Sequence, residues 1–174
     1  MKQIRLSGSG GQGVILAAII LAEAAVLEGK YAIQTQAYGP EARGGASKAE
    51  VIIAEERVAY PKVTSPDIVL ALNQESCDKF GSNLKKGDIL IVDTTFVQEL
   101  PETEAEIVKV PITELARKEL GRELFSNIIA LGALVGATQV VEREFIEKAV
   151  LARVPKGTEE KNMKALELGF SAVN

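Results

Sequence analysis

The stretch Ser7–Gly13, which reads Ser-Gly-Ser-Gly-Gly-Gln-Gly, constrains the fold more than any other part of the chain. It follows a short strand-like run and opens into an apolar run predicted to be helical from about Gln12 to Glu28. Gly8, Gly10 and Gly13 stand at the G-x-G-x-x-G spacing, which allows a tight turn and close approach of backbone to a ligand. Free N–H groups at the start of the helix can then bind a phosphate or another anion. The alternative interpretation is a tight turn with a purely structural role.

Two short, almost wholly apolar runs, 67–72 and 88–93, predict central parallel strands that are buried on both faces. The strand predicted at 47–54 follows the preceding one after about ten residues without a helix, which is too short for a parallel crossover. We therefore expect it to be antiparallel and to pair with Arg57–Tyr60 as an edge hairpin. Together these patterns predict a single α/β domain over residues 1–174.

Helices are predicted to dominate the C-terminal third, where Gly132 and Gly136 stand four residues apart in an apolar helix over 126–141. Outside a membrane such a face of small residues predicts close helix packing, in the core or at an interface. The last predicted helix, 158–173, carries one apolar stripe that is typical of packing. The fold class is thus a Rossmann-like three-layer sandwich with a mostly parallel sheet, an antiparallel edge hairpin and a helical C-terminal third. The first helix is apolar nearly all round, so either the sheet and a second layer or another subunit must cover it.

A second glycine-rich stretch follows the second predicted strand and has turn-forming residues at both ends. It carries Tyr38, Glu41 and Arg43, and the guanidinium of Arg43 offers a planar fork of donors suited to carboxylate or phosphate. Gly44 and Gly45 allow the backbone to approach a partner closely. The alternative is a solvated loop whose charged side chains face water.

Several kinds of site are excluded by composition. The chain has no histidine and one cysteine, Cys77, so it cannot by itself form a zinc site, a Ser-His-Asp triad or a Cys-His pair. It cannot ligate an iron–sulfur cluster alone, and Cys77 is predicted to be a structural thiol. No catalytic residue and no metal ligand is therefore assigned to this chain.

Charge and hydropathy limit the partners. The net charge is −4 and there is no basic block, which argues against nucleic acid as a partner. The apolar run after the glycine turn is interrupted by Glu23 and is too short to cross a bilayer, which needs roughly 20 apolar residues. We expect a cytoplasmic protein without a membrane partner. A nicotinamide cofactor is also disfavoured, because Thr35 and Gln36 stand where an acidic residue normally binds the ribose.

Taken together, three motifs resemble the gamma subunit of 2-oxoacid:ferredoxin (acceptor) oxidoreductases. They are Gly8-Ser-Gly-Gly-Gln-Gly-Val14, Gln34-Thr-Gln-Ala-Tyr-Gly-Pro-Glu-Ala-Arg-Gly-Gly45 and Asn127-Ile-Ile-Ala-Leu-Gly-Ala-Leu-Val-Gly136. The resemblance covers nearly the whole chain, and the second motif looks most like the 2-oxoglutarate type. Pyruvate, branched-chain and indolepyruvate relatives remain open.

The resemblance implies a multi-subunit enzyme that oxidatively decarboxylates a 2-oxoacid to an acyl-coenzyme A and reduces ferredoxin. It implies alpha and beta partner subunits that hold thiamine diphosphate and magnesium, with iron–sulfur clusters on the beta subunit or on a ferredoxin-like delta subunit. This chain would complete the complex near coenzyme A, with no cofactor bound by it alone. The residues expected to face that ligand or a partner lie in the two glycine-rich loops: Gly8, Gly10, Gly11, Gln12, Gly13, Tyr38, Glu41, Arg43, Gly44 and Gly45.

Two other functions stay open from the sequence. One is a free-standing nucleotide-binding module or a small flavin- or nicotinamide-dependent enzyme, which would need the acidic residue that the second strand lacks. The other is a purely architectural subunit whose glycines serve only interface packing.

Overall fold

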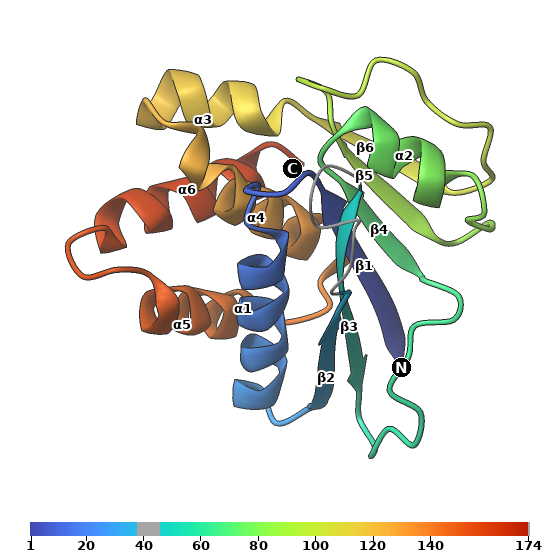
Figure 1. Cartoon of the computed structure of the whole chain (residues 1–174). Coiled ribbons are helices and arrows are strands. Elements are labelled where there is room, and N and C mark those ends of the chain that lie inside the picture. The colour runs from blue at the N-terminus through green and yellow to red at the C-terminus, as the bar shows by residue number, and fades with distance from the viewer. Residues whose placement is uncertain (38–45, 174) are drawn as a thin grey trace.

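The computed structural model describes residues 1–37 and 46–173. The described strands form one sheet, and they are β1 (Lys2–Gly8), β2 (Tyr31–Gln36), β3 (Ser47–Ala54), β4 (Ile68–Ala71), β5 (Ile89–Asp93) and β6 (Glu106–Val110). The helices are α1 (Val14–Leu27), α2 (Gln74–Gly81), α3 (Ile112–Leu120), the short 3₁₀ helix η2 (Glu123–Phe125), α4 (Ser126–Thr138), α5 (Arg143–Arg153) and α6 (Glu159–Ser171). The predicted α/β class and the helical C-terminal third are confirmed (Figure 1).

The sheet has the strand order β2-β3-β1-β4-β5-β6. Strands β1, β4, β5 and β6 are parallel, as the apolar runs predicted, and β3 is antiparallel to both of its neighbours. The edge hairpin is therefore formed by β2 and β3. The prediction that Arg57–Tyr60 would be the hairpin partner is wrong, because this segment forms no strand. Since β1 and β2 occupy both edges of β3, no edge remains with which it could pair.

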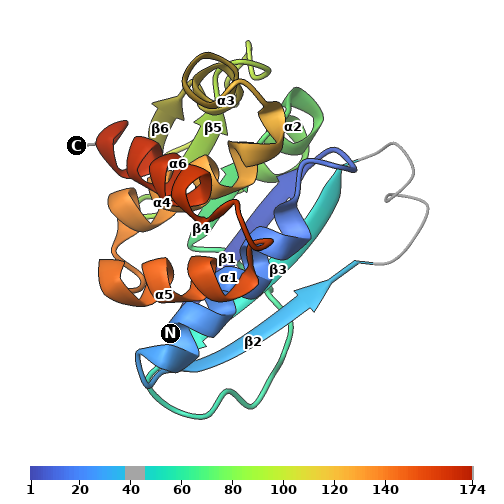
Figure 2. The ribbon, with the colours of Figure 1, turned by 90° about the vertical axis from the view of Figure 1, so that its left-hand side faces the viewer.

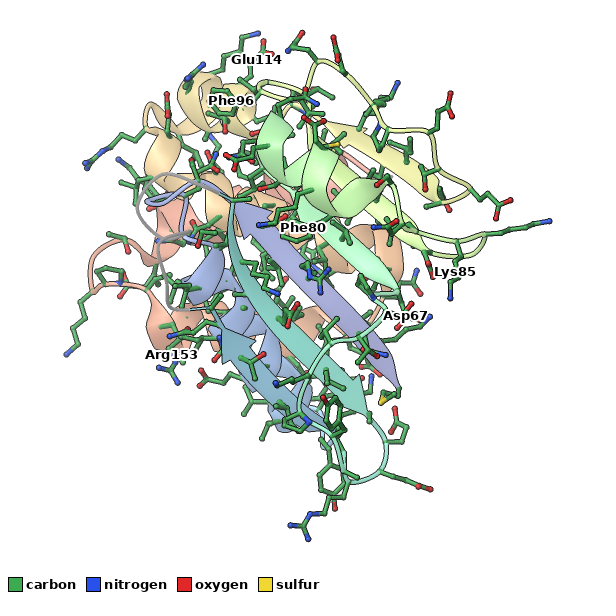
Figure 3. The ribbon with its side chains drawn as sticks, turned by 45° about the vertical axis from the view of Figure 1, so that its right-hand side comes forward. Asp67, Phe80, Lys85, Phe96, Glu114 and Arg153 are labelled. Atoms are coloured by element: carbon green, nitrogen blue, oxygen red, sulfur yellow. The ribbon has the colours of Figure 1, made fainter. Side chains whose placement is uncertain are left out.

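The layers of the fold come from the alternation of side chains along the strands. On one face, apolar residues such as Ile4, Leu6 and Leu70 pack against α1 and α4, while α5 and α6 form an outer row (Figure 1). On the opposite face the covering layer is α2, whose Phe80 lies over the sheet with the Arg5 guanidinium 4.9 Å from its ring centre (Figure 3). Among the described residues α2 is the one helix of this third layer, and it lies over β1 and β4 rather than over β2 and β3 (Figure 3).

Helices α4 and α6 make the most extensive helix–helix contact of the molecule, and glycines form its centre. A Cβ atom on Gly132 would overlap the carbonyl oxygen of Leu166. A Cβ on Gly169 would overlap the carbonyl oxygen of Ile129 and lie 2.6 Å from the Ala133 nitrogen. The predicted close packing is thus confirmed as a contact within this chain. The apolar stripe of the last helix, with Leu166 and Phe170 in the core, supplies its other half.

Helix α1 is covered by strands β2 and β3 on one side and by α5 on another. An ion pair of 2.6 Å between Arg153 and Glu23 ties α5 to α1. The first alternative, cover by the sheet and a second layer, is confirmed for most of the helix, while Leu16, Val26 and Leu27 still face solvent. Within residues 1–37 and 46–173, no helix is both long and apolar enough to cross a membrane.

Candidate functional site

The glycine turn joins β1 to α1 at the carboxyl edge of the sheet, which is the edge where open α/β sheets bind ligands (Figure 1). The Gln12 N–H donates to the Ser9 carbonyl at 3.2 Å and closes a four-residue turn. Gly11 has φ 89°, as the third residue of a type II turn requires, and Gly10 precedes it. Gly13 has φ 74° and is the last residue before the helix. Left-handed backbone at two positions explains why glycine stands there.

The side chain of Gln12 folds back into this turn. Its Oε1 accepts a hydrogen bond from the Ser9 N–H at 2.7 Å, and its Nε2 donates to the Leu72 carbonyl at 3.3 Å. The amide therefore fastens the turn to the end of β4. It also lies over Gly8, where an added Cβ would come 2.5 Å from Gln12 Oε1. The first glycine of the motif thus makes room for a side chain of the turn itself.

Asn127, in the first turn of α4, closes the other side of the glycine turn. Its Nδ2 donates a long hydrogen bond of 3.5 Å to the Gly13 carbonyl, and a Cβ on Gly13 would come 2.6 Å from that nitrogen. Asn127 opens the third motif, but sequence reasoning did not assign it to the site, because it lies 114 residues from Gly13. The one signal available was a polar residue in the first turn of an otherwise apolar helix.

The start of α1 carries no side-chain cap and no acidic residue in its first turn. The N–H groups of that turn have no intrahelical acceptor, so they attract an anion or an acceptor group of a partner. A cavity of about 300 Å³ opens beside this helix end between Leu16, Asn127, Arg122 and Lys161. Neither Arg122 nor Lys161 has an ion-pair partner among the residues that the structure describes. The surroundings of the turn therefore favour a negatively charged group.

Other polar residues at this edge of the sheet are used within the fold. Asn73 caps α2, since its Oδ1 accepts from the Ser76 N–H at 2.9 Å. The buried carboxylate of Asp93 accepts from the Thr95 N–H at 3.0 Å and from the Thr113 hydroxyl at 2.6 Å. Both residues therefore act as caps, and both carboxylate oxygens of Asp93 are used within the fold.

The second predicted loop lies outside the described residues, so Tyr38, Glu41, Arg43, Gly44 and Gly45 have no structural description here. Its flanks are described. Ser47, two residues after Gly45 in the sequence, pairs with Gly8 in the β1–β3 ladder. The chain after the second loop therefore continues directly beside the glycine turn.

Cys77 lies in α2 and is fully buried. Burial, with a smaller effect of neighbouring Asp78, raises the pKa of its thiol to about 11. The thiol is thus protonated at neutral pH and is neither a nucleophile nor a ready metal ligand. Residues 1–37 and 46–173 hold no group of three or more potential metal-binding side chains.

The strand order of the sheet also argues against a nicotinamide cofactor. In a dinucleotide-binding fold the ribose-binding acid follows the strand beside β1. Here β3 separates β2 from β1, and β3 runs in the opposite direction. Thr35 and Gln36 are therefore two strands away from the glycine turn.

A glycine turn at the carboxyl edge of a mixed sheet, with helices packed behind it, defines a Rossmann-like α/β protein. Comparison with known proteins gives the family: the chain belongs to the pyruvate ferredoxin/flavodoxin oxidoreductase family, which it matches over residues 3–172.

Two relatives are similar over nearly their whole length, and a third over part of a longer chain. The 2-oxoglutarate synthase subunit KorC of Methanocaldococcus jannaschii is 49% identical over 97% of this chain and 92% of its own. The crystal structure of a keto/oxoacid ferredoxin oxidoreductase gamma subunit from Geobacter sulfurreducens has a TM-score of 0.90 and 48% identity, covering 99% of this chain and 98% of that one. A 2-oxoglutarate:ferredoxin oxidoreductase from Magnetococcus marinus, 21% identical, has the same fold in 31% of its chain, with a TM-score of 0.86.

Proposed function

We propose that this chain is the gamma subunit of a 2-oxoglutarate:ferredoxin oxidoreductase. The observation that carries the proposal is the similarity to KorC subunits of 2-oxoglutarate synthases, at 49% and 46% identity over 97% of this chain. Common gamma subunits of pyruvate/ketoisovalerate oxidoreductases are less similar, at 34% identity for the one from Thermococcus litoralis. Among the oxoacids, 2-oxoglutarate is therefore favoured.

In this proposal the chemistry belongs to partner subunits. Thiamine diphosphate and magnesium would be held by the alpha and beta subunits, and iron–sulfur clusters by the beta subunit or a ferredoxin-like delta subunit. Ferredoxin would accept electrons from the complex. The residues of this chain do not fit an iron–sulfur cluster, because it has no histidine and its one cysteine is buried and protonated. No reaction step is assigned to this chain.

The role proposed for this chain is to complete the coenzyme A region of the complex. Gly8, Gly10, Gly11, Gln12 and Gly13 would present the start of α1 to a phosphate or to a partner carboxylate. Two observations support this. The first turn of α1 has no side-chain cap, and the nearby cavity is lined by the cationic side chains of Arg122 and Lys161, which have no ion-pair partners among the described residues. The second loop would contribute Tyr38, Glu41, Arg43, Gly44 and Gly45, with Arg43 binding the same kind of group.

The experiment is an Arg43→Ala substitution in the assembled complex. Loss of a charge-assisted contact should raise the KM for coenzyme A or weaken subunit retention by about tenfold. Arg57→Ala is the matched control, because Arg57 is an exposed arginine whose side chain makes no ion pair within the described part of the chain. If Arg43→Ala leaves both quantities unchanged, the assignment of Arg43 is contradicted.

A purely architectural subunit is the second candidate, and one observation favours it. The side chain of Gln12 already fills the inner side of the turn, so the glycines have a role without any ligand. Normal assembly and normal turnover of glycine-turn variants would support this candidate. Tight binding of a nucleotide to the isolated chain, measured by titration calorimetry, would instead favour a nucleotide-binding module.

A further inference from the structure

The two edges of the sheet differ in how they are protected against pairing with another chain. At one edge, β6 carries the exposed charged residues Glu106 and Lys109. Charged side chains on an edge strand discourage addition of a further strand. At the other edge, β2 reads Tyr-Ala-Ile-Gln-Thr-Gln over Tyr31–Gln36 and contains no charge and no proline. Figure 2 shows β2 at the outer margin of the sheet.

The backbone of β2 offers hydrogen-bonding groups on its outer side. The Ala37 N–H donates to the Lys48 carbonyl at 3.3 Å, which makes Ala37 and Lys48 a hydrogen-bonded pair of the antiparallel ladder. Because bonded and non-bonded pairs alternate, Ile33 is bonded to β3, while Ala32 and Gln34 direct their N–H and C=O groups away from it. These outward groups are the template that strand addition uses.

Apolar side chains flank this edge. Val26 and Leu27, at the end of α1, are 58% and 48% exposed, and Tyr31, at the start of β2, is 52% exposed. The register places Tyr31 and Ile33 on the sheet face opposite to α1, because their neighbours Ala32 and Ile53 pack in the core under α1. A strand added beside β2 would therefore find apolar contacts on both faces of the sheet.

We propose that an extended, uncharged segment of a partner subunit adds to the sheet alongside β2. A second copy of this chain fits less well. Antiparallel pairing of two β2 strands centred on each other would set the apolar Tyr31 end of one against the polar Gln36 end of the other. A segment of different sequence can place apolar residues opposite Tyr31. The inference rests on the proposed function, since it takes the partner from the same complex.

Hydrogen exchange of the backbone amides tests the proposal directly. The full complex and the isolated chain are compared by mass spectrometry over the peptides that contain β2 and β6. Assembly should slow exchange of the Ala32 and Gln34 amides at least about tenfold, because they gain acceptors in the partner strand. The peptide over Glu106–Val110 is the internal control and should show no added protection.

A matched pair of variants gives the second readout. Gln34→Pro removes an outward N–H and leaves all hydrogen bonds to β3 in place, whereas Gln34→Val keeps the outward N–H. Retention of this chain by the partner subunits should fall about tenfold with proline and stay unchanged with valine. Where the proline variant proves unfolded by circular dichroism, Val26→Glu replaces it, with the remote exposed Leu100→Lys as its control.

The possible outcomes distinguish failure of the strand-addition proposal from failure of the proposed function. Assembly of the natural chain without added protection at β2, or full retention of folded Gln34→Pro, overturns the strand-addition proposal and leaves the proposed function standing. Protection that appears in the isolated chain as its concentration rises overturns it in favour of a second copy. Failure of the natural chain to assemble with alpha and beta subunits overturns the proposed function and this inference with it.

Discussion

Glycine shapes two regions of this molecule, the turn between β1 and α1 and the contact between α4 and α6, in different ways. In the helix contact, Gly132 and Gly169 bring two backbones together, and any side chain there would overlap main-chain atoms. In the turn, Gly11 and Gly13 have positive φ, and a Cβ on Gly11 would meet no atom within 4 Å. The helix glycines therefore serve stability, whereas Gly11 leaves open space beside an uncapped helix start. We expect substitutions in the two regions to affect different measurements.

The largest effect on stability should come from Gly169→Ala. The added methyl would overlap the Ile129 carbonyl, and it can be accommodated only if α4 and α6 separate. Overpacking of this kind lowers the free energy of unfolding by about 3 kcal/mol, measured by urea denaturation of the isolated chain. Gly136→Ala is the control, because its methyl would meet the Val173 side chain rather than backbone, and a smaller loss is expected. Equal small losses for both would refute the backbone contact.

Gly13→Ala should come next. Alanine at φ 74° is strained, and its methyl would press on Asn127 Nδ2 at 2.6 Å, so we expect a loss of about 2 kcal/mol. Adding Asn127→Ala removes the two nearest atoms, Nδ2 and Cγ, and should restore part of the loss. A double-mutant cycle measures this coupling. Strictly additive losses would show that the two residues do not interact.

Gln12→Ala should have a moderate effect. It removes two hydrogen bonds that fasten the turn to Ser9 and to the end of β4, which corresponds to about 1 kcal/mol of unfolding free energy. Gln12→Glu is informative beside it, because a carboxylate keeps the acceptor for the Ser9 N–H and loses the donor to the Leu72 carbonyl. Stabilities of the natural chain and both variants, measured in the same urea series, should fall in the order natural, Glu, Ala.

Gly11→Ala should lower the unfolding free energy by about 1 kcal/mol, no more than Gln12→Ala, since only the positive φ opposes it. Gly11→Asn should cost less, because asparagine tolerates left-handed backbone. Both side chains would project into the open space beside the turn. Both variants should therefore lower retention in the complex or raise the KM for coenzyme A more than they lower stability. Loss of stability alone, with normal assembly and a normal KM for coenzyme A, would show that Gly11 serves only stability, as Gly132 and Gly169 do.

Much of the fold could be predicted because its signals are local. The apolar runs of β4 and β5 identify buried parallel strands, and the spacing of Gly132 and Gly136 indicates close helix packing. Pairing across the chain could not be predicted in the same way. Arg57–Tyr60 has the composition of a short strand, but the edges of β3 are taken by β1 and β2.

The candidate site shows the same division between local and distant signals. The tight turn could be predicted from the spacing of Gly8, Gly10 and Gly13, and positive φ is found at Gly13 and at Gly11, which lies between the spaced glycines. Contact of Gly13 with Asn127 depends on how α4 packs beside α1, and no local pattern encodes it. The inward fold of the Gln12 side chain likewise depends on the carbonyl that Leu72 offers at the end of β4.

We propose that this chain completes a 2-oxoglutarate:ferredoxin oxidoreductase, and one assay tests this directly. The direct measurement is the reduction of a viologen acceptor, dependent on 2-oxoglutarate and coenzyme A, by the alpha and beta subunits purified with and without this chain. We expect the activity to fall at least about tenfold without this chain and to return when the purified chain is added back. Full activity of the alpha and beta subunits alone, unchanged by addition of the chain, would contradict this role.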